Sequence, residues 1–488
     1  MDKPLKILFV SSEMFPFAKV GGLADVSGSL PKALVSLGHD VRAIIPMYKC
    51  VAEGGFELEK LYDNIKHPLT GRMFGFGLYQ SRQAGLTTYF IQNNKFFSRN
   101  GIYGASWGEY PDNALRFSFF SKAVLAASEK ADFHPDIIHC NDWQTALVPF
   151  YLRFSVPHDG FFHGTKSLFT IHNLAYQGVF GKAIMSLAGI PKKFFNMNSL
   201  EFYGKINYMK SGIIYSDIIN TVSRKYASEI LTPEYGCKLN GLLRSRESNL
   251  VGIPNGVDYD EWSPEKDRYL KVNYGPENLQ GKAACKKDLI EYTGLSVNPE
   301  RPLLGCVSRL VAQKGMDLLA GVIGDIVEMD AGIVILGDGD DYNTRLFRGL
   351  ADKYPEKVCV RHEFNDELAH KIEAGCDMFV MPSRYEPCGL NQMYSIKYGT
   401  VPIVRATGGL DDVIIDNDAD PNNGNGFKFR EINENALLDA VKRAFSWYGD
   451  KDGWKGIMQR GMAADHSWRH SAQEYLGLYE RILEKEKM

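Results

Sequence analysis

The segment KILFVSSEMFPFAKVGGLADVSGSLPKALVSLG spans residues 6–38 and contains the unit on which the fold depends. It begins with a short apolar run at residues 6–12, passes through a glycine pair, and continues with an amphipathic pattern over residues 23–38. The apolar run predicts a buried strand, and the amphipathic pattern predicts a helix. A strand, a glycine-rich turn and a helix in this order are typical of an open α/β sheet.

The same alternation runs through most of the chain and restarts after about residue 260. Strands separated by helices imply parallel sheets that are covered on both faces, and two such series imply two doubly wound domains. The first series has predicted strands at 6–12, 40–46, 87–93, 136–142, 166–173 and 217–223, and predicted helices at 23–38 and 111–130. The second has predicted strands at 302–310, 331–337, 357–364, 377–383 and 401–407, and predicted helices at 315–329, 366–376 and 390–399.

The polar segment NGVDYDEWSPEKD at residues 255–267 is the best candidate for a linker between the two series. It predicts an N-terminal domain over residues 1–258 and a C-terminal domain over residues 259–466. The remaining residues, 467–488, contain a final helical pattern, and the pattern alone does not indicate where that helix docks.

Size and composition limit the possible classes of protein. The chain has 488 residues, too many for one hydrophobic core, and its 44% hydrophobic and 24% charged content is ordinary for a globular protein. A net charge of −3 gives no general attraction to nucleic acid or to an anionic membrane. No apolar run approaches the roughly 20 residues of a membrane helix, and the eight cysteines lack metal-binding spacing. We therefore expect no nucleic-acid or membrane partner, and a cytoplasmic location.

A glycine pair occurs twice in similar surroundings, as KVGGLADV at residues 19–26 and as ATGGLDDV at residues 406–413. Each pair follows a predicted strand and opens a predicted helix, where free backbone N–H groups favour an anion. The alternative is that the glycines only form tight turns. Two such loops, with a lysine at position 19 in the first, favour phosphate binding. The candidate residues are Lys19, Gly21, Gly22, Gly408 and Gly409.

A second cationic loop follows the predicted strand at 302–310. In SRLVAQKG, residues 308–315, Arg309 and Lys314 lie on one strand-to-helix turn with Gly315 at the helix entry. Two cations and a glycine at such a turn predict another anion site. The alternative is an ordinary solvated basic loop.

Polar side chains also follow three other predicted strands. Glu386, in YEPCGLNQMYSIKYG, suits sugar hydroxyls, although a helix-capping role is the alternative. His172 lies at the end of the strand at 166–173 and is a candidate site residue; the alternative is a purely structural histidine. Asp142 and Trp143 lie in HCNDWQTALVP. A carboxylate beside an exposed indole suits a sugar, because the ring covers the apolar sugar face.

Several common signatures are missing from the sequence. No GxGxxG follows the first strand, and there is no P-loop, GxSxG or HExxH. The acidic residues of ILGDGDDY, at 335–342, could suggest a metal site, but the segment fits another strand-to-helix turn better. We therefore predict neither a metal nor a cofactor.

Taken together, KVGGLADV, HCNDWQTALVP, TIHNLAYQG, IPNGVD, SRLVAQKG, SRYEPCGLNQMYSIKYG and VRATGGLDDV resemble the bacterial glycogen synthase and plant starch synthase family over nearly the whole chain. The resemblance implies a GT-B fold, with two Rossmann-like doubly wound domains facing a deep interdomain cleft. It implies transfer of glucose from ADP-glucose to the non-reducing 4-hydroxyl end of an α-1,4-glucan, with retention of configuration. Glycogen, starch or a malto-oligosaccharide is the implied acceptor.

The resemblance also implies roles for individual residues on the nucleotide-sugar side. Lys19, Arg309 and Lys314 would contact the phosphates, Glu386 the glucose hydroxyls, and Phe364 the base. This side of the implied site comprises Lys19, Gly21, Gly22, Asn255, Arg309, Lys314, Phe364, Glu386, Cys388, Gly389, Leu390, Thr407, Gly408 and Gly409.

On the acceptor side, the resemblance implies that Asp142, Trp143 and Tyr103 line the site and that His172 points at the reacting sugar. Residues 1–258 would carry the acceptor, residues 259–466 the nucleotide sugar, and the helix in 467–488 would pack back on the N-terminal domain. The implied catalytic residues are Lys19, His172, Arg309, Lys314 and Glu386.

The sequence departs from many retaining GT-B enzymes eight positions after Glu386, where Tyr394 stands in place of a second glutamate. Rival interpretations are a UDP-glucose-dependent synthase, a sucrose- or trehalose-type transferase, a phosphorylase with pyridoxal phosphate, and a non-catalytic glucan-binding protein. The sequence leaves open the natural product, the oligomeric state, and a plastid location after removal of a transit peptide.

Overall fold

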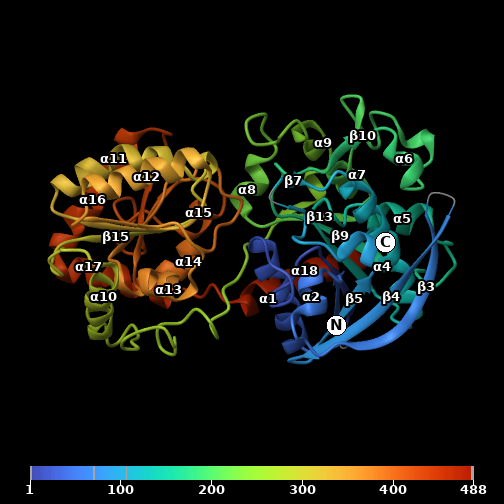
Figure 1. Cartoon of the computed structure of the whole chain (residues 1–488), viewed down its shortest axis with the longest axis horizontal. Coiled ribbons are helices and arrows are strands. Elements are labelled where there is room, and N and C mark those ends of the chain that lie inside the picture. The colour runs from blue at the N-terminus through green and yellow to red at the C-terminus, as the bar shows by residue number, and fades with distance from the viewer. Residues whose placement is uncertain (1–2, 70–71, 106, 485–488) are drawn as a thin grey trace. The chain divides into compact units, whose positions relative to one another are not determined.

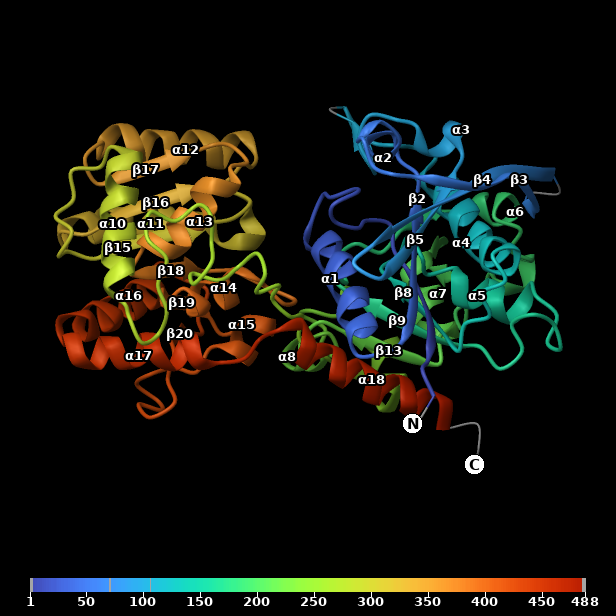
Figure 2. The ribbon, with the colours of Figure 1, turned by 90° about the horizontal axis from the view of Figure 1, so that it is seen from below.

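The computed structural model describes residues 3–69, 72–105 and 107–484, and its ribbon is drawn in Figures 1 and 2. The described chain divides into two compact units. Unit 1 comprises Met1–Val222, Ala227–Gly256 and Trp468–Met488, and unit 2 comprises Ser223–Tyr226 and Val257–Ser467.

In the described residues, unit 1 is built on one sheet of nine strands in which the strand order reverses around β1. The strands from β14 to β5 are parallel, and an antiparallel hairpin extends one edge. All six strands predicted in this half are present. In spatial order the strands are β14 (Leu250–Gly252), β13 (Ile218–Thr221), β9 (Lys166–Ile171), β8 (Ile137–Asn141), β1 (Lys6–Val10), β2 (Asp40–Pro46), β5 (Leu86–Gln92), β4 (Arg72–Gln83) and β3 (Glu59–Leu69).

The β3–β4 hairpin was not predicted from the sequence. Most side chains of β3 are exposed, and only its last residues alternate between buried and exposed. Such a strand lacks the apolar signal on which sequence prediction depends. Small antiparallel strands form two further sheets in this unit, namely β6 (Gly104–Ala105) with β7 (Gly108–Glu109), and β10 (Val179–Gly181) with β12 (Lys205–Asn207) and β11 (Glu201–Phe202).

Helices cover the unit 1 sheet, and the last helix of the chain is one of them. Helix α18 (Trp468–Glu484) packs against α1 (Gly22–Ser36) and β9, as can be followed in Figure 2. The Tyr479 hydroxyl lies 2.8 Å from Nδ1 of buried His139, and the Tyr475 hydroxyl donates to Asn220 Oδ1 at 2.9 Å. Buried polar contacts therefore fix this helix on the sheet. The other helices are α2 (Lys49–Glu53), α3 (Asn94–Phe97), α4 (Asn113–Lys130), α5 (Val148–Phe154), α6 (Ile184–Leu187), α7 (Tyr208–Tyr215) and α9 (Asn240–Ser245).

Unit 2 is a doubly wound domain on a parallel sheet of six strands, counted over the residues that the structure describes. Successive side chains of its strand β16 point to opposite faces: Ile333 and Ile335 pack under α11, α12 and α16, whereas Val334 and Leu336 face α10 and α13. Figure 1 shows these two layers of helices on either side of the sheet. In spatial order the strands are β17 (Val358–Arg361), β16 (Gly332–Leu336), β15 (Leu303–Val307), β18 (Met378–Met381), β19 (Val401–Arg405) and β20 (Phe427–Phe429). The helices are α10 (Gln280–Thr293), α11 (Met316–Glu328), α12 (Asp341–Lys353), α13 (Asp366–Gly375), α14 (Asn391–Lys397), α15 (Gly408–Val413), α16 (Glu434–Gly449) and α17 (Lys451–Ala463).

The second half of the predicted linker, residues 262–267, is well packed. The Trp262 ring stacks between Tyr394 and His370, with ring centroids 4.0 and 3.8 Å away. The Asp267 carboxylate lies 2.6 Å from His370 Nδ1 and accepts a hydrogen bond of 2.6 Å from Tyr398. These contacts make residues from Trp262 onward part of unit 2.

The short segment Ser223–Tyr226, at the start of α8 (Arg224–Glu229), also belongs to unit 2. Its link is Asp412, which accepts hydrogen bonds from the Ser223 hydroxyl at 2.6 Å and from the Lys225 backbone at 3.0 Å. In the described ranges, no helix has both the length and the apolar character of a membrane span.

Candidate functional site

The first glycine pair lies between β1 and α1, and Lys19 precedes it. The Lys19 ammonium is 2.7 Å from Asp25 Oδ1, and its side chain is 46% exposed. An exposed ion pair of this kind contributes little stability and is readily exchanged for another anion. The ion pair therefore keeps Lys19 near the start of α1 but leaves its ammonium able to bind another anion.

The two glycines of this loop are not required by the packing of the chain. A Cβ added to Gly21 or Gly22 would meet no atom of the described chain within 4 Å. Gly22 is the first residue of α1, and the first N–H groups of a helix have no partner inside it. The open space beside these N–H groups suits the close approach of an anion.

The structure corrects one expectation about this loop. The amides of Val20 and Gly21 donate to Glu13 Oε2, at 2.6 and 2.9 Å, so the Gly21 amide is not a free donor. Glu13 is only 4% exposed. Sequence reasoning missed Glu13, because a single acidic residue in a loop carries no motif.

Tyr103 belongs to the same cluster. Its hydroxyl donates to Glu13 Oε1 at 2.6 Å and lies 2.8 Å from the Ser12 hydroxyl. Burial raises the pKa of Glu13, although its hydrogen bonds oppose this effect, and burial also raises the pKa of Tyr103 well above its ordinary value. The structure thus gives Tyr103, the predicted acceptor contact, a partner within the protein.

Asp142 and His172 meet at the ends of β8 and β9. Asp142 Oδ1 accepts a hydrogen bond of 2.8 Å from the His172 backbone, and burial raises the pKa of Asp142 to about 7. His172 Nε2 lies 2.9 Å from Asn141 Oδ1, while burial lowers the pKa of His172 to about 3. The Asn141 amide group donates to the Val10 carbonyl, so its oxygen faces the histidine. His172 is therefore neutral at neutral pH and carries its proton on Nε2.

The expectation of an exposed indole at Trp143 is wrong. Trp143 is 8% exposed, and its ring lies 5.1 Å from that of Phe117 and 5.5 Å from that of Phe180. A Cβ on Gly178 would come within 2.5 Å of the same ring. The indole is held in the aromatic core because its large apolar surface is better buried than left in water.

In unit 2 the structure brings two predicted site residues into direct contact. Lys314 Nζ lies 2.5 Å from Glu386 Oε2, which also accepts a hydrogen bond of 3.0 Å from the Ser383 hydroxyl. The Glu386 side chain is only 7% exposed. Gly315 explains the close approach of these loops, because a Cβ there would stand 2.0 Å from the Pro382 carbonyl oxygen. The sequence had assigned these two residues to different parts of the ligand.

Arg309 lies on the same turn as Lys314 but is held more weakly. Its guanidinium donates to Gln313 Oε1 at 3.2 Å on the exposed surface. Gln313 in turn donates to the Tyr385 carbonyl at 3.4 Å. Arg309 therefore keeps most of its donors directed to solvent or to a ligand.

The second glycine pair serves a different purpose from the first. A Cβ on Gly408 would lie 1.8 Å from the Glu386 carbonyl oxygen, and one on Gly409 would lie 2.1 Å from that of Cys388. The Gly409 amide donates to the Glu386 and Pro387 carbonyls, both at 3.2 Å. These glycines allow two loops to pack together, so the expectation of a free Gly409 amide is wrong.

The neighbouring predicted residues complete the Glu386 loop. Cys388 is buried, and Gly389 has a φ of +72°, a backbone conformation that favours glycine. The Gln392 amide donates to both of their carbonyls at 3.0 Å. Leu390 and Thr407 precede the first residues of α14 and α15.

Two predicted nucleotide-sugar residues stand apart from these clusters. Phe364 lies between β17 and α13 and is 89% exposed. Asn255 follows β14 in unit 1 and is buried, and its side-chain oxygen finds no hydrogen-bond partner among the described residues. An exposed ring and an unsatisfied buried oxygen are both features that a ligand would explain.

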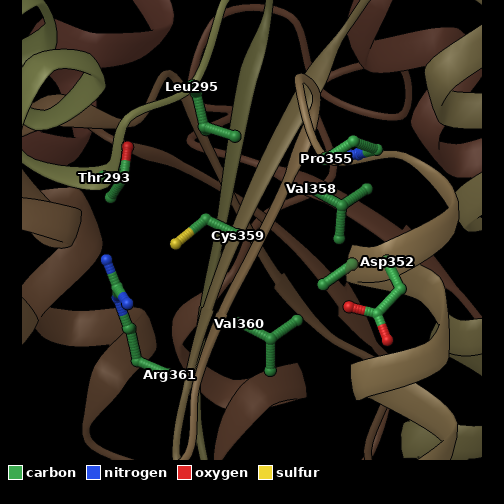
Figure 3. A pocket seen from close by; sticks show the side chains of 9 residues that line it. Thr293, Leu295, Asp352, Pro355, Val358, Cys359, Val360 and Arg361 are labelled. Atoms are coloured by element: carbon green, nitrogen blue, oxygen red, sulfur yellow. The ribbon is translucent and has the colours of Figure 1, made fainter.

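A hollow of about 330 Å³ lies at the edge strand β17, and Figure 3 shows its lining. The side chains around it include Thr293, Cys359 and Arg361, and none of its lining residues is a predicted site residue. No group of three or more His, Cys, Asp or Glu side chains suited to a metal occurs in the described part of the chain.

Comparisons with known proteins show the family of this chain. A family model described as "Starch synthase catalytic domain" matches residues 6–245, and one described as "Glycosyl transferases group 1" matches residues 294–451. A glycogen synthase of Moorella thermoacetica is 48% identical over 100% of this chain and 99% of its own length. A glycogen synthase of Thermotoga maritima is 45% identical over 99% of each chain.

Solved structures give the same result. The catalytic domain of starch synthase IV from Arabidopsis thaliana, bound to ADP and acarbose, superposes with a TM-score of 0.91 at 35% identity. The superposition covers 99% of this chain and all of that one. A sucrose-phosphate synthase from Thermosynechococcus elongatus, at 18% identity and a TM-score of 0.63, shares the fold, covering 99% of this chain and all of its own.

The predicted fold class is therefore confirmed: each unit is a Rossmann-like domain of the GT-B type. The predicted enzyme class, a glycosyltransferase of glycogen or starch synthesis, is confirmed as well. The chain belongs to the glycogen synthase and starch synthase family.

Proposed function

We propose that this enzyme transfers glucose from ADP-glucose to the non-reducing 4-hydroxyl end of an α-1,4-glucan, with retention of configuration and without a metal or cofactor. The observation that carries the proposal is the first glycine loop. Its Gly21 and Gly22 border open space that the packing of the chain does not explain, and Lys19 lies beside them. Such a loop suits the phosphates of a nucleotide sugar.

The choice of ADP-glucose has support from one relative. The Arabidopsis starch synthase IV domain, which superposes over nearly the whole chain, was solved with ADP and acarbose. The curated relatives are bacterial glycogen synthases. We therefore propose an adenine nucleotide as donor and glycogen or a related glucan as acceptor, with the cytoplasm as the location.

Each unit contributes cations in this proposal. Lys19 in unit 1 and Arg309 and Lys314 in unit 2 would neutralise the negative charge that develops on the departing diphosphate. Glu386 would orient Lys314 and accept hydrogen bonds from the glucose hydroxyls, since its two oxygens can serve both partners. Exposed Phe364 would stack on the base. Preorganised charges of this kind are typically worth about 10²–10³ in rate each.

On the acceptor side, neutral His172 would accept a hydrogen bond from a sugar hydroxyl at Nδ1, because its Nε2–H is directed at Asn141 Oδ1, and it would not act as a cation. Asp142 would hold its backbone in place. Buried Trp143 would support the site from the core without touching the sugar. Tyr103 would contact the acceptor and would also act through its hydrogen bond to Glu13.

Retention without a second glutamate requires a suitable proton acceptor. Tyr394 occupies that position and stacks on Trp262. We propose that the acceptor hydroxyl attacks the anomeric carbon on the face from which the diphosphate departs. The bond from that carbon to the phosphate oxygen breaks as the new glycosidic bond forms, and the departing phosphate takes the hydroxyl proton.

Release of ADP tests this proposal directly. The purified enzyme is incubated with ADP-glucose or UDP-glucose, each with glycogen, with glucose or with no acceptor, in the presence and absence of EDTA. We expect ADP release that depends on glycogen and survives EDTA. Faster turnover of UDP-glucose, activity with glucose alone, or a complete loss in EDTA that metal restores would contradict it.

A further inference from the structure

We propose that Glu13 is a positioning residue that holds the Lys19 loop in the geometry in which Lys19 meets the donor diphosphate. The inference rests on the proposed function. Glu13 follows β1, the central strand of unit 1, and it touches the loop that carries Lys19 without touching Lys19 itself in any recorded contact of the described chain.

The contacts of Glu13 join three segments of unit 1. In the described chain, Oε2 accepts from the Val20 and Gly21 amides, and Oε1 accepts from the Tyr103 hydroxyl. Val20 is the residue next to Lys19, and Gly21 directly precedes the first residue of α1. One carboxylate thus fixes the backbone on the C-terminal side of Lys19 and at the entry to the helix.

The negative charge of Glu13 strengthens the hydrogen bonds that hold the loop. Hydrogen bonds to an ionised acceptor are roughly twice as strong as those between neutral groups. The two amides can only donate, so Oε2 must act as an acceptor. Because Glu13 is only 4% exposed, water offers its carboxylate little alternative to these protein donors. Removing the negative charge should therefore loosen the loop without removing any atom from it.

The same geometry argues against direct substrate contact by Glu13. Both of its oxygens are occupied by donors of the protein at 2.6 to 2.9 Å. The exposed cation of the loop is Lys19, whose ammonium makes an exposed ion pair with Asp25 and lies 5.6 Å from the centroid of the Phe15 ring. Glu13 therefore acts through the position of Lys19.

A double-mutant cycle separates this role from a general structural one. Glu13→Gln keeps the shape of the side chain and removes its charge. It is measured in the natural background and in Lys19→Ala. We expect Glu13→Gln alone to lower kcat about tenfold and to change KM for ADP-glucose less than about threefold, because the charge of Lys19 acts mainly on the transition state. In the Lys19→Ala background we expect no further loss.

Two kinetic results would overturn the inference: natural kinetics in Glu13→Gln, or a tenfold loss that is the same in both backgrounds. Glu53→Gln is the matched control, since this carboxylate is in the same unit and its ion pair with Lys49 is long and exposed. Hydrogen exchange offers a second measurement. The amides of Val20 and Gly21 should exchange faster in Glu13→Gln, and unchanged exchange would also overturn the inference.

If Glu13→Gln does not fold, Tyr103→Phe replaces it in the same cycle, because it removes one donor to Glu13 and leaves the carboxylate in place. We then expect the loss of kcat to be about threefold larger in the natural background than in the Lys19→Ala background, where only an effect of Tyr103 on the acceptor remains, and an equal loss in both backgrounds would overturn the inference. The proposed function fails separately, through absence of ADP-glucose activity in the natural enzyme.

Discussion

Lys314 and Glu386 form an ion pair of 2.5 Å in a partly buried turn, and only 18% and 7% of the two side chains is exposed. A buried carboxylate that loses its cation is strongly destabilised, because neither water nor protein replaces the lost charge. The pair therefore orients Lys314 for phosphate binding and also contributes to the stability of unit 2.

Replacing Lys314 separates these two effects. We expect Lys314→Ala to lower kcat about 10²–10³-fold, because a preorganised charge is lost, and to lower Tm by several degrees, because Glu386 is left unpaired. Lys314→Ala combined with Glu386→Gln should recover the Tm but not the activity. Exposed Lys442→Ala on α16 is the control. Full activity in Lys314→Ala would remove it from the leaving-group role.

Asp142 should make the stability of the protein depend on pH. Burial raises its folded-state pKa to about 7, whereas the unfolded value is about 4. The folded state therefore binds more protons between these values, and the contribution of Asp142 to the free energy of unfolding falls as pH rises from about 4 to about 7.

Asp142→Asn removes this titration while keeping the oxygen that accepts from the His172 backbone. We expect the Tm of the natural protein, relative to that of Asp142→Asn, to fall between pH 4.5 and pH 7.5 and then to level off. Taking the difference cancels the opposite contribution of His172, whose lowered pKa favours stability at higher pH. A difference in Tm that is constant over this range would contradict the raised pKa.

At the scale of elements, the two glycine pairs show that one sequence pattern can serve two purposes. The first borders open space at the start of α1, and the second allows two loops of unit 2 to pack together. A side chain would therefore meet open space at the first pair, beside Lys19, and backbone carbonyl oxygens at the second.

Alanine at each pair should give opposite results. We expect Gly22→Ala to keep the natural Tm, because its Cβ meets open space, and to lower kcat/KM for ADP-glucose at least tenfold. We expect Gly409→Ala to lower Tm by several degrees, because its Cβ would stand 2.1 Å from the Cys388 carbonyl oxygen. Natural kinetics in Gly22→Ala would show that no ligand needs this space.

Local sequence predicted the elements well wherever apolar side chains repeat with the period of a strand or helix. The strands β1, β8 and β15 and the polar turns after them are examples. Strand β3 was missed because its side chains are mostly exposed. The burial of Trp143 and the contacts of Glu13 depend on residues far apart in the chain, so no local pattern could reveal them.

Helix α18 depends on a buried polar contact for its place in unit 1. Tyr479→Phe would leave Nδ1 of fully buried His139 without its partner at 2.8 Å. An unsatisfied buried group costs about 1–3 kcal/mol, so we expect a Tm lower by several degrees in calorimetry. Exposed Tyr203→Phe is the control. A Tm within one degree or so of the natural value in Tyr479→Phe would contradict this role.

At the scale of the whole molecule, both units follow one plan. Each has a sheet whose parallel strands reverse their order near its centre, and in each the predicted site residues follow the carboxyl ends of strands. Ligands of open α/β sheets bind at such positions. The fold therefore places the loops of Lys19, Arg309 and Lys314 at the ends of strands where a ligand of such a sheet would bind.

The central claim is that these loops neutralise a nucleotide diphosphate without a metal. Its most direct test is ADP release from ADP-glucose and glycogen, measured in EDTA for the natural enzyme, Lys19→Ala and Arg309→Ala. The account predicts activity in the natural enzyme and losses of about 10²–10³-fold in each variant. Natural turnover in both variants, or an enzyme that is inactive until a divalent metal is added, would contradict it.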